Sequence, residues 1–226
     1  NAFWYPHTEL EEYLKGIFRR IDTIKIKRKG FQTLVINIKE RKPFAIWCDG
    51  RPTSEVSTSA SDDNVGIIGQ NTRPSDSEEV LSLAEPTCYF IDQNSTVFAK
   101  APYFSGDAYF KYYGLISTST DELPIGKEYM ASTTEFSNVS NFVSKIKELS
   151  IQPLYLIAKD GGDFSIILSG GGEIYFDMKA SLTIVSQNLE ALLRTPAFAS
   201  STGDLPIEYI DLRYGNKLFY KLKTTN

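Results

Sequence analysis

Residues 24–39 read IKIKRKGFQTLVINIK, and this stretch decides the fold of the N-terminal part of the chain. Apolar residues alternate with Lys25 and Lys27, the pattern breaks at Gly30, and it resumes at Leu34. Alternation of this kind places successive side chains on opposite faces of a strand. The stretch therefore predicts a β-hairpin with one apolar face and a mostly basic outer face.

A helix is predicted immediately before this hairpin. Apolar residues recur at helical spacing from Leu10 onward, and Thr8 followed by Glu11 matches a capping box. These signals predict a helix from about Thr8 to Arg19. Two strands beside one helix bury little apolar surface, so a further strand and helix before Asn1 are expected to complete this module.

The rest of the chain alternates short strand patterns with two further amphipathic helices. This order predicts an α+β fold with a mainly antiparallel sheet rather than a parallel βαβ sheet. The predicted elements are strands 44–48, 88–91, 96–99, 154–159, 164–168, 173–176, 207–212 and 217–222, and helices 134–149 and 181–194.

Two segments do not fit these patterns. Residues 49–86 are rich in Ser, Asp, Thr, Asn and Gly, and a structureless segment of this length is uncommon inside a domain. We therefore predict an inserted polar loop there. Residues 103–113 contain six aromatic residues, which predict the packing of an irregular loop rather than an aromatic ligand site.

The composition favours a folded protein, and the sequence contains no recognised catalytic motif. The chain has 226 residues, of which 42% are hydrophobic, and its net charge of −4 gives no reason to expect a nucleic-acid partner. His7 is the only histidine, which disfavours histidine-based catalytic and metal sites. No catalytic residue, metal or cofactor is predicted. A pair of acids in a cleft, as glycosidases use, is an alternative that the sequence does not locate.

Cys48 and Cys88 are the two cysteines, and their spacing fits no zinc motif. Both lie in predicted strands. They are therefore either two buried thiols or a disulfide, which would require an oxidising compartment. A disulfide would join the two ends of the predicted insertion.

The C-terminal segment is both basic and aromatic. Residues 213–223 contain four cations and no acid. At a sheet edge, the unpaired main-chain groups of such a segment can accept a strand from another chain, while its lysines bind partner carboxylates. Edge lysines that only prevent aggregation are the alternative interpretation. The candidate partner-binding residues are Arg213, Tyr214, Lys217, Leu218, Phe219, Tyr220 and Lys221.

Three segments, in order along the chain, resemble the FtsQ/DivIB family of bacterial cell-division proteins. Residues 40–47 resemble its ERxPxAxW segment, residues 89–98 its IDxxGxVF hairpin, and residues 209–214 its closing YIDLRY strand. The family's turn glycine is absent here, and Asn94 is expected to adopt the backbone conformation of that glycine.

The resemblance implies a partial POTRA domain at 1–42 and an FtsQ-type β domain at 43–226, with the insertion at about 49–86. It implies a divisome scaffold anchored in the inner membrane by one upstream transmembrane helix, with this region outside the membrane at the septum. Its implied partners are FtsB-like and FtsL-like division proteins, and its implied role is the regulation of septal peptidoglycan synthesis.

The resemblance also implies how the partner binds. The partner's C-terminal segment is expected to add a strand beside the last β strands. Arg213 is then expected to meet a partner carboxylate, and Tyr214 to pack against the partner's apolar residues. A POTRA-type polypeptide-binding module of a secretion or outer-membrane assembly system is the alternative function.

Overall fold

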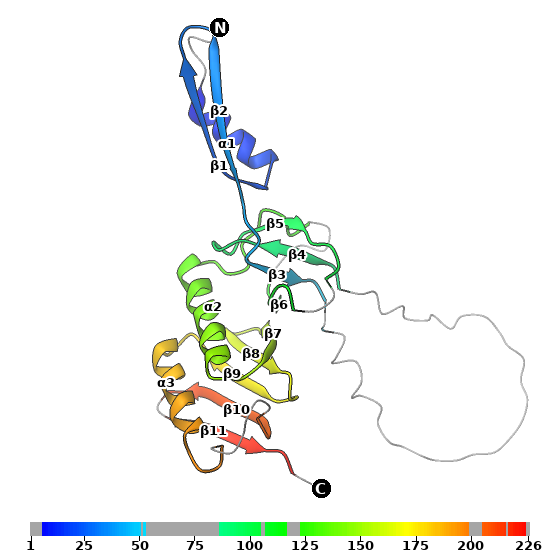
Figure 1. The fold of residues 1–226 in the computed structure, drawn as a ribbon, viewed down its shortest axis with the longest axis vertical. Helices are drawn as coiled ribbons and strands as arrows, with labels where there is room; N and C mark the ends of the chain where they lie inside the picture. Colours follow the sequence, from blue (N-terminus) through cyan, green and yellow to red (C-terminus); the bar gives the residue numbers. More distant parts are fainter. Residues whose placement is uncertain are drawn as a thin grey trace, which may run out of the picture.

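The computed structural model describes residues 6–50, 52, 86–104, 107–116, 123–198, 205–215 and 217–224. A small N-terminal module projects from one end of a nine-stranded sheet (Figure 1). Helices and a mainly antiparallel set of strands occur together, which confirms the predicted α+β class. Most of the predicted insertion at 49–86 lies outside the described residues.

The N-terminal module consists of one helix and two strands. These elements are α1 (His7–Ile17), β1 (Ile21–Lys29) and β2 (Thr33–Glu40). The predicted capping box is wrong, because Pro6 occupies the N-cap position and no side chain caps the helix. Glu11 instead accepts a hydrogen bond of 2.8 Å from the main-chain N–H of Ile26. The glutamate therefore ties α1 to β1 rather than closing the helix end.

Strands β1 and β2 form the predicted hairpin, whose register pairs Ile24 with Ile38 and Ile26 with Ile36. Helix α1 covers the β1 half of this apolar face through residues such as Leu10. Every residue of β2 is exposed. The described residues of the N-terminal module therefore leave half of one apolar face uncovered.

Nine strands and two helices form the second part of the described molecule. They are β3 (Ala45–Cys48), β4 (Cys88–Ile91), β5 (Val97–Lys100), β6 (Lys111–Tyr113), α2 (Thr133–Glu148), β7 (Pro153–Ala158), β8 (Asp163–Leu168), β9 (Glu173–Asp177), α3 (Leu182–Leu193), β10 (Ile207–Tyr214) and β11 (Lys217–Leu222). The strand order is β11-β10-β9-β8-β7-β6-β3-β4-β5.

Five strand pairs in this sheet are antiparallel and three are parallel. The parallel pairs β6–β7 and β9–β10 are connected through α2 and α3. The sheet is mainly antiparallel, as predicted, but the domain also contains two βαβ units that the prediction from element order did not include. Parallel neighbours need such a crossover connection, so the helices are part of the sheet topology.

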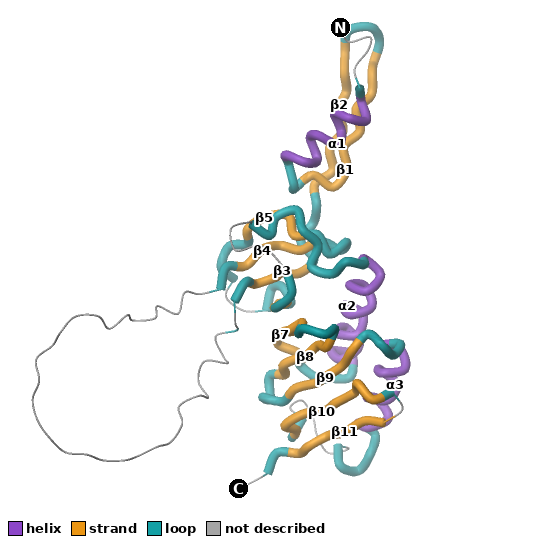
Figure 2. The backbone as a smooth tube through the Cα atoms, turned by 180° about the vertical axis from the view of Figure 1, so that it is seen from behind, coloured by secondary structure: helices purple, strands orange, loops and turns teal. Residues whose placement is uncertain are grey.

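Helices α2 and α3 cover one face of the sheet (Figures 1 and 2). The ring centroid of Phe142 lies 4.8 Å from that of Phe176, and Phe164 stacks on Phe176 at 5.0 Å. The hydroxyl groups of Tyr112 and Ser140 are 3.2 Å apart, which satisfies both polar groups inside the core. Burial raises the pKa of Tyr112 to about 12, although this hydrogen bond acts in the opposite direction.

The aromatic stretch 103–113 contains a strand that the sequence pattern did not reveal. Strand β6 has three residues and lies between β3 and β7, pairing in parallel with both. So short a strand shows no measurable periodicity. On the face opposite the helices, the ring of Phe90 lies 5.9 Å from that of Phe104 and 5.5 Å from that of Tyr109. These aromatic residues therefore pack against the sheet.

The turn between β4 and β5 differs from the prediction. Ser95, not Asn94, has the positive φ, at 70°. The carboxylate of Asp92 accepts hydrogen bonds of 2.9 Å from the N–H groups of Asn94 and Thr96. The Ser95 hydroxyl accepts a bond of 2.8 Å from the N–H of Met130. Ser95 therefore combines the backbone conformation of a turn with a side-chain link to a distant loop.

Arg41 connects the N-terminal module to the sheet domain. Its Nε donates to the carbonyl oxygen of Arg19 at 3.1 Å, and its main-chain N–H donates to that of Arg20 at 2.8 Å. Its Nη1 forms an ion pair with the buried carboxylate of Asp92. One residue therefore bonds to both parts of the molecule and orients one against the other.

Candidate partner-binding edge

Strand β11 lies at the end of the sheet that is remote from the N-terminal module (Figure 2). It pairs with β10, and no other strand in the described ranges pairs with it. The side-chain amide of Asn188 in α3 donates to the carbonyl oxygen of Gly215 at 3.0 Å, next to the β10–β11 turn. The two strands are therefore anchored to α3, while no described strand covers the outer side of β11.

The outward main-chain groups of β11 belong to alternate residues. The N–H of Lys223 donates to the carbonyl oxygen of Pro206 at 2.9 Å, so Lys223 faces β10. Main-chain groups alternate in direction along a strand. The N–H and C=O groups of Leu218, Tyr220 and Leu222 therefore point away from β10, where an added strand could bond to them.

The opposite edge of the sheet, at β5, is partly occupied by the chain itself. The N–H of Val97 donates to the carbonyl oxygen of Lys127 at 2.9 Å, and the N–H of Gly126 donates to that of Val97 at 2.7 Å. An antiparallel bridge also joins Thr96 to Glu128. Of the two edges, β11 is thus the more open to another chain.

The side of β11 that faces α3 is apolar. Leu218 packs against the main core, and the ring of Tyr220 lies 5.3 Å from that of the buried Phe198. Tyr220 and Leu222 are still 42% and 40% exposed. Apolar side chains of an added strand could pack against this partly exposed apolar side of β11.

The other side of β11 carries two lysines and an aromatic ring. Phe219 packs edge-to-face against Tyr214, with ring centroids 5.2 Å apart. The Nζ of Lys221 lies 2.6 Å from the carboxylate of Glu208, and this hydrogen bond raises the pKa of Lys221. Lys217 forms no ion pair with any residue that the structure describes. Of the two lysines, Lys217 is therefore the cation most available to a partner.

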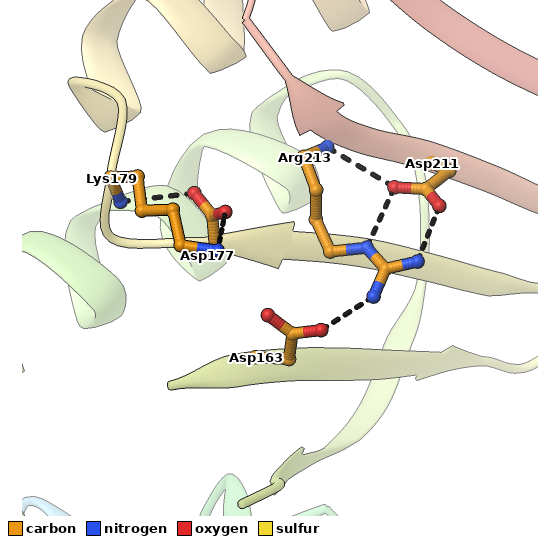
Figure 3. Close-up of polar contacts among 5 residues, drawn as sticks. All are labelled: Asp163, Asp177, Lys179, Asp211 and Arg213. Carbon is orange, nitrogen blue, oxygen red and sulfur yellow. Dashed lines mark hydrogen bonds and ion pairs between the residues drawn. The ribbon is translucent and has the colours of Figure 1, made fainter. Parts of the chain in front are cut away.

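Arg213 lies on β10, behind this edge, and is held by carboxylates of its own chain (Figure 3). Its Nε and Nη2 donate to the two carboxylate oxygens of Asp211 at 2.9 and 2.6 Å, and its Nη1 donates to Asp163. Its guanidinium also lies 5.5 Å from the ring centre of Tyr175. Burial favours a higher pKa for Asp211, but the hydrogen bonds from Arg213 outweigh it and hold that pKa below its ordinary value.

These contacts bear on two expectations from the sequence. A partner carboxylate could bind Arg213 only in competition with Asp163 and Asp211. The same two acids both contact the guanidinium, so they do not form the open carboxylate pair of a glycosidase. Asp163 is 50 residues away in sequence, and no local pattern could have linked it to Arg213.

The structure resolves the question left open for Cys48 and Cys88, which form a disulfide. The two residues lie directly opposite each other in the antiparallel register of β3 and β4, with Cα atoms 4.0 Å apart. The bond lies in the half of the sheet remote from β11 and closes the ends of the 49–86 segment.

Within the described ranges, no three His, Cys, Asp or Glu side chains gather closely enough to hold a metal ion. A hollow of about 710 Å³ between α2 and α3 is lined by polar and apolar residues together, including Lys145 and Lys179, with Glu190 as its one acid. None of the described helices is both long and apolar enough to cross a bilayer. The β11 edge is therefore the best-supported candidate site.

Comparison with known proteins does not assign the chain to a family. No protein-family model matches the sequence, and no curated protein matches it.

Proposed function

We propose that this chain is a non-enzymatic protein-binding domain that accepts an extended segment of another protein as an additional strand beside β11. The supporting observation is the difference between the two edges of the sheet. The β5 edge is bonded to its own loop, whereas β11 pairs with β10 alone among the described strands. An edge strand with unpaired main-chain groups is the surface that β-strand addition requires.

The two sides of β11 indicate the chemistry of the partner. Alternate partner residues would face α3 and meet Leu218, Tyr220 and Leu222, so apolar side chains are favoured at those positions. The intervening partner residues would lie near Lys217 and Phe219, where an acid and an aromatic or aliphatic side chain fit. The expected partner segment therefore alternates apolar residues with residues that include at least one acid.

The resemblance to FtsQ/DivIB proteins indicates a specific partner for this edge. Under this proposal, the partner is the C-terminal segment of an FtsB-like protein, in complex with an FtsL-like protein. The assembly acts outside the inner membrane at the septum and regulates septal peptidoglycan synthesis. Support comes from three family-like motifs in the expected order and from an open edge strand directly after the third of them.

The N-terminal module is consistent with the same proposal. Leu34, Ile36 and Ile38 lie exposed beside α1 on the face that the helix only half covers. A partial POTRA domain would leave such a surface. We propose that a strand and a helix upstream of this chain cover it in the full-length protein, after a single membrane anchor.

Binding of the FtsB-like protein of the same organism, measured by calorimetry, tests the proposal with two substitutions at one position. Tyr220→Pro removes an outward N–H without touching the bonds to β10, whereas Tyr220→Thr keeps that N–H and removes the ring. At about 1–1.5 kcal/mol per hydrogen bond, Tyr220→Pro is expected to weaken binding by roughly tenfold or more. Tyr220→Thr is expected to weaken it less.

Circular dichroism and thermal unfolding check that both variants are folded. Unchanged affinity in a folded Tyr220→Pro variant would exclude strand addition at β11. Equal losses in the two variants would show that the ring, not the main chain, carries the interaction.

A further inference from the structure

The two strands of the N-terminal hairpin are basic in an otherwise acidic chain. Strands β1 and β2 contain five Lys and Arg residues and two Asp and Glu residues, a net charge of +3, whereas the whole chain carries −4. Such a local excess of positive charge attracts an anionic partner only at short range, because salt screens charges that lie more than about 8 Å apart at physiological ionic strength.

The register concentrates these charges on one face. Lys25, Lys27 and Lys29 follow each other at every second position of β1, so they lie on the face opposite α1, about 7 Å apart. The residues opposite them on β2 are neutral: the pairs are Lys25 with Asn37, Lys27 with Val35, and Lys29 with Thr33. All six residues are exposed. These six residues are named the basic face below.

An ion pair within the hairpin lies at its other end. Lys39 bonds to the carboxylate of Asp22 at 2.8 Å, and this hydrogen bond is the main cause of the lowered pKa of Asp22. Lys25, Lys27 and Lys29 form no ion pair with any described residue. The three positive charges of the basic face are thus available to an external anion.

The surroundings of the basic face favour a lipid surface over a nucleic acid. The hairpin projects away from the sheet domain (Figures 1 and 2), so the acidic bulk of the molecule does not cover this face. Val35 is exposed among the lysines, and Phe31 at the hairpin turn is 76% exposed. Lysines beside exposed apolar side chains suit the boundary between phosphate headgroups and acyl chains.

We propose that the basic face docks on a membrane surface that contains anionic phospholipids. The inference goes beyond the proposed function, because it involves a different surface at the opposite end of the molecule. Each lysine close to an anionic bilayer strengthens binding by roughly fivefold, so three lysines contribute on the order of 100-fold.

Vesicle flotation at physiological salt tests this inference. Vesicles of equal parts phosphatidylglycerol and phosphatidylcholine are compared with vesicles of phosphatidylcholine alone. The wild-type chain is expected to float with the anionic vesicles only, and raising the salt is expected to release it. The triple variant Lys25→Gln, Lys27→Gln, Lys29→Gln is expected to lose about 100-fold in partition.

A matched triple variant removes the same charge from the sheet domain, by Lys100→Gln, Lys147→Gln and Lys159→Gln, three exposed lysines that form no ion pair with any described residue. It is expected to change partition by less than about threefold. An equal loss in this control, or equal flotation with neutral vesicles, would overturn the proposal. Tighter binding to a DNA duplex than to anionic vesicles would also overturn it. Binding of the FtsB-like protein serves as a separate readout, because neither triple variant alters β11.

Discussion

Reduction of the Cys48–Cys88 disulfide is expected to destabilise the sheet domain by about 4 kcal/mol. The bond joins residues 40 positions apart. In the chain-entropy model, opening a loop of that length restores about 4 kcal/mol of conformational freedom to the unfolded chain. The expected contribution to the free energy of unfolding is large because the closed loop is long. The bond joins β4 to β3 at the point where a long segment leaves the sheet.

Urea unfolding followed by tryptophan fluorescence measures this effect, because the buried Trp47 is the neighbour of Cys48 in β3. With a slope of about 2 kcal/mol per molar, reduction is expected to lower the unfolding midpoint by about 2 M. The double variant Cys48→Ala, Cys88→Ala is expected to fall slightly further. It also loses packing around the fully buried Cys48, at a cost of about 1 kcal/mol.

The comparison of these two samples separates the cross-link from the packing. A reduced wild-type protein, with both thiols verified by alkylation and mass measurement, should lie between the oxidised protein and the double variant. A shift of less than about 0.5 M on full reduction would refute the loop-entropy reasoning. It would mean that the 49–86 segment is already restrained in the unfolded chain.

Two further outcomes follow from the polar contacts. Hydrogen bonds from Arg213 lower the pKa of Asp211. The ionised carboxylate therefore stabilises the folded state at pH values above its unfolded pKa of about 3.9. This stabilisation is lost as the pH falls through the folded pKa. Asp211→Asn is therefore expected to lower the free energy of unfolding at pH 7 and to make its decrease below about pH 4 less steep. Urea unfolding midpoints measured across this pH range test both effects. An unchanged pH dependence would contradict the proposed contribution of the Asp211 carboxylate. Arg41→Gln is expected to broaden the distance distribution between spin labels on β2 and α3 in pulsed EPR. It is also expected to lower the sheet domain's melting temperature, because the buried carboxylate of Asp92 loses its ion-pair partner. An unaltered distance distribution would show that other contacts orient the module.

Elements with a clear period could be predicted from the sequence. Helix α2 was expected at 134–149 and spans Thr133–Glu148, and β11 was expected at its observed limits. Local periodicity cannot reveal the order of strands in a sheet. The two parallel crossovers and the three-residue β6 were therefore missed, because they depend on contacts between distant segments.

The candidate site was predictable to a similar extent. Alternating lysines and aromatic residues correctly marked β11 as a strand, and its edge position agrees with the condition stated for strand addition. The sequence did not reveal that Asp163 and Asp211 bind Arg213. Asp211 is only two residues away on the same strand, but the contact with Asp163 requires β8 and β10 to flank β9 in one sheet. The disulfide depends on the register that places Cys48 opposite Cys88, which the sequence alone does not reveal.

The unequal ends of the sheet limit how many molecules can join through it. If two copies met through β11 about a twofold axis, the resulting double sheet would end in a β5 strand on both sides. At those ends the N–H and C=O groups of Val97 are already bonded to Lys127 and Gly126. Growth beyond a closed pair would be disfavoured, since a filament needs two complementary, open surfaces on every subunit. An open β11 edge opposite a partly occupied β5 edge thus favours one docking event over continued polymerisation.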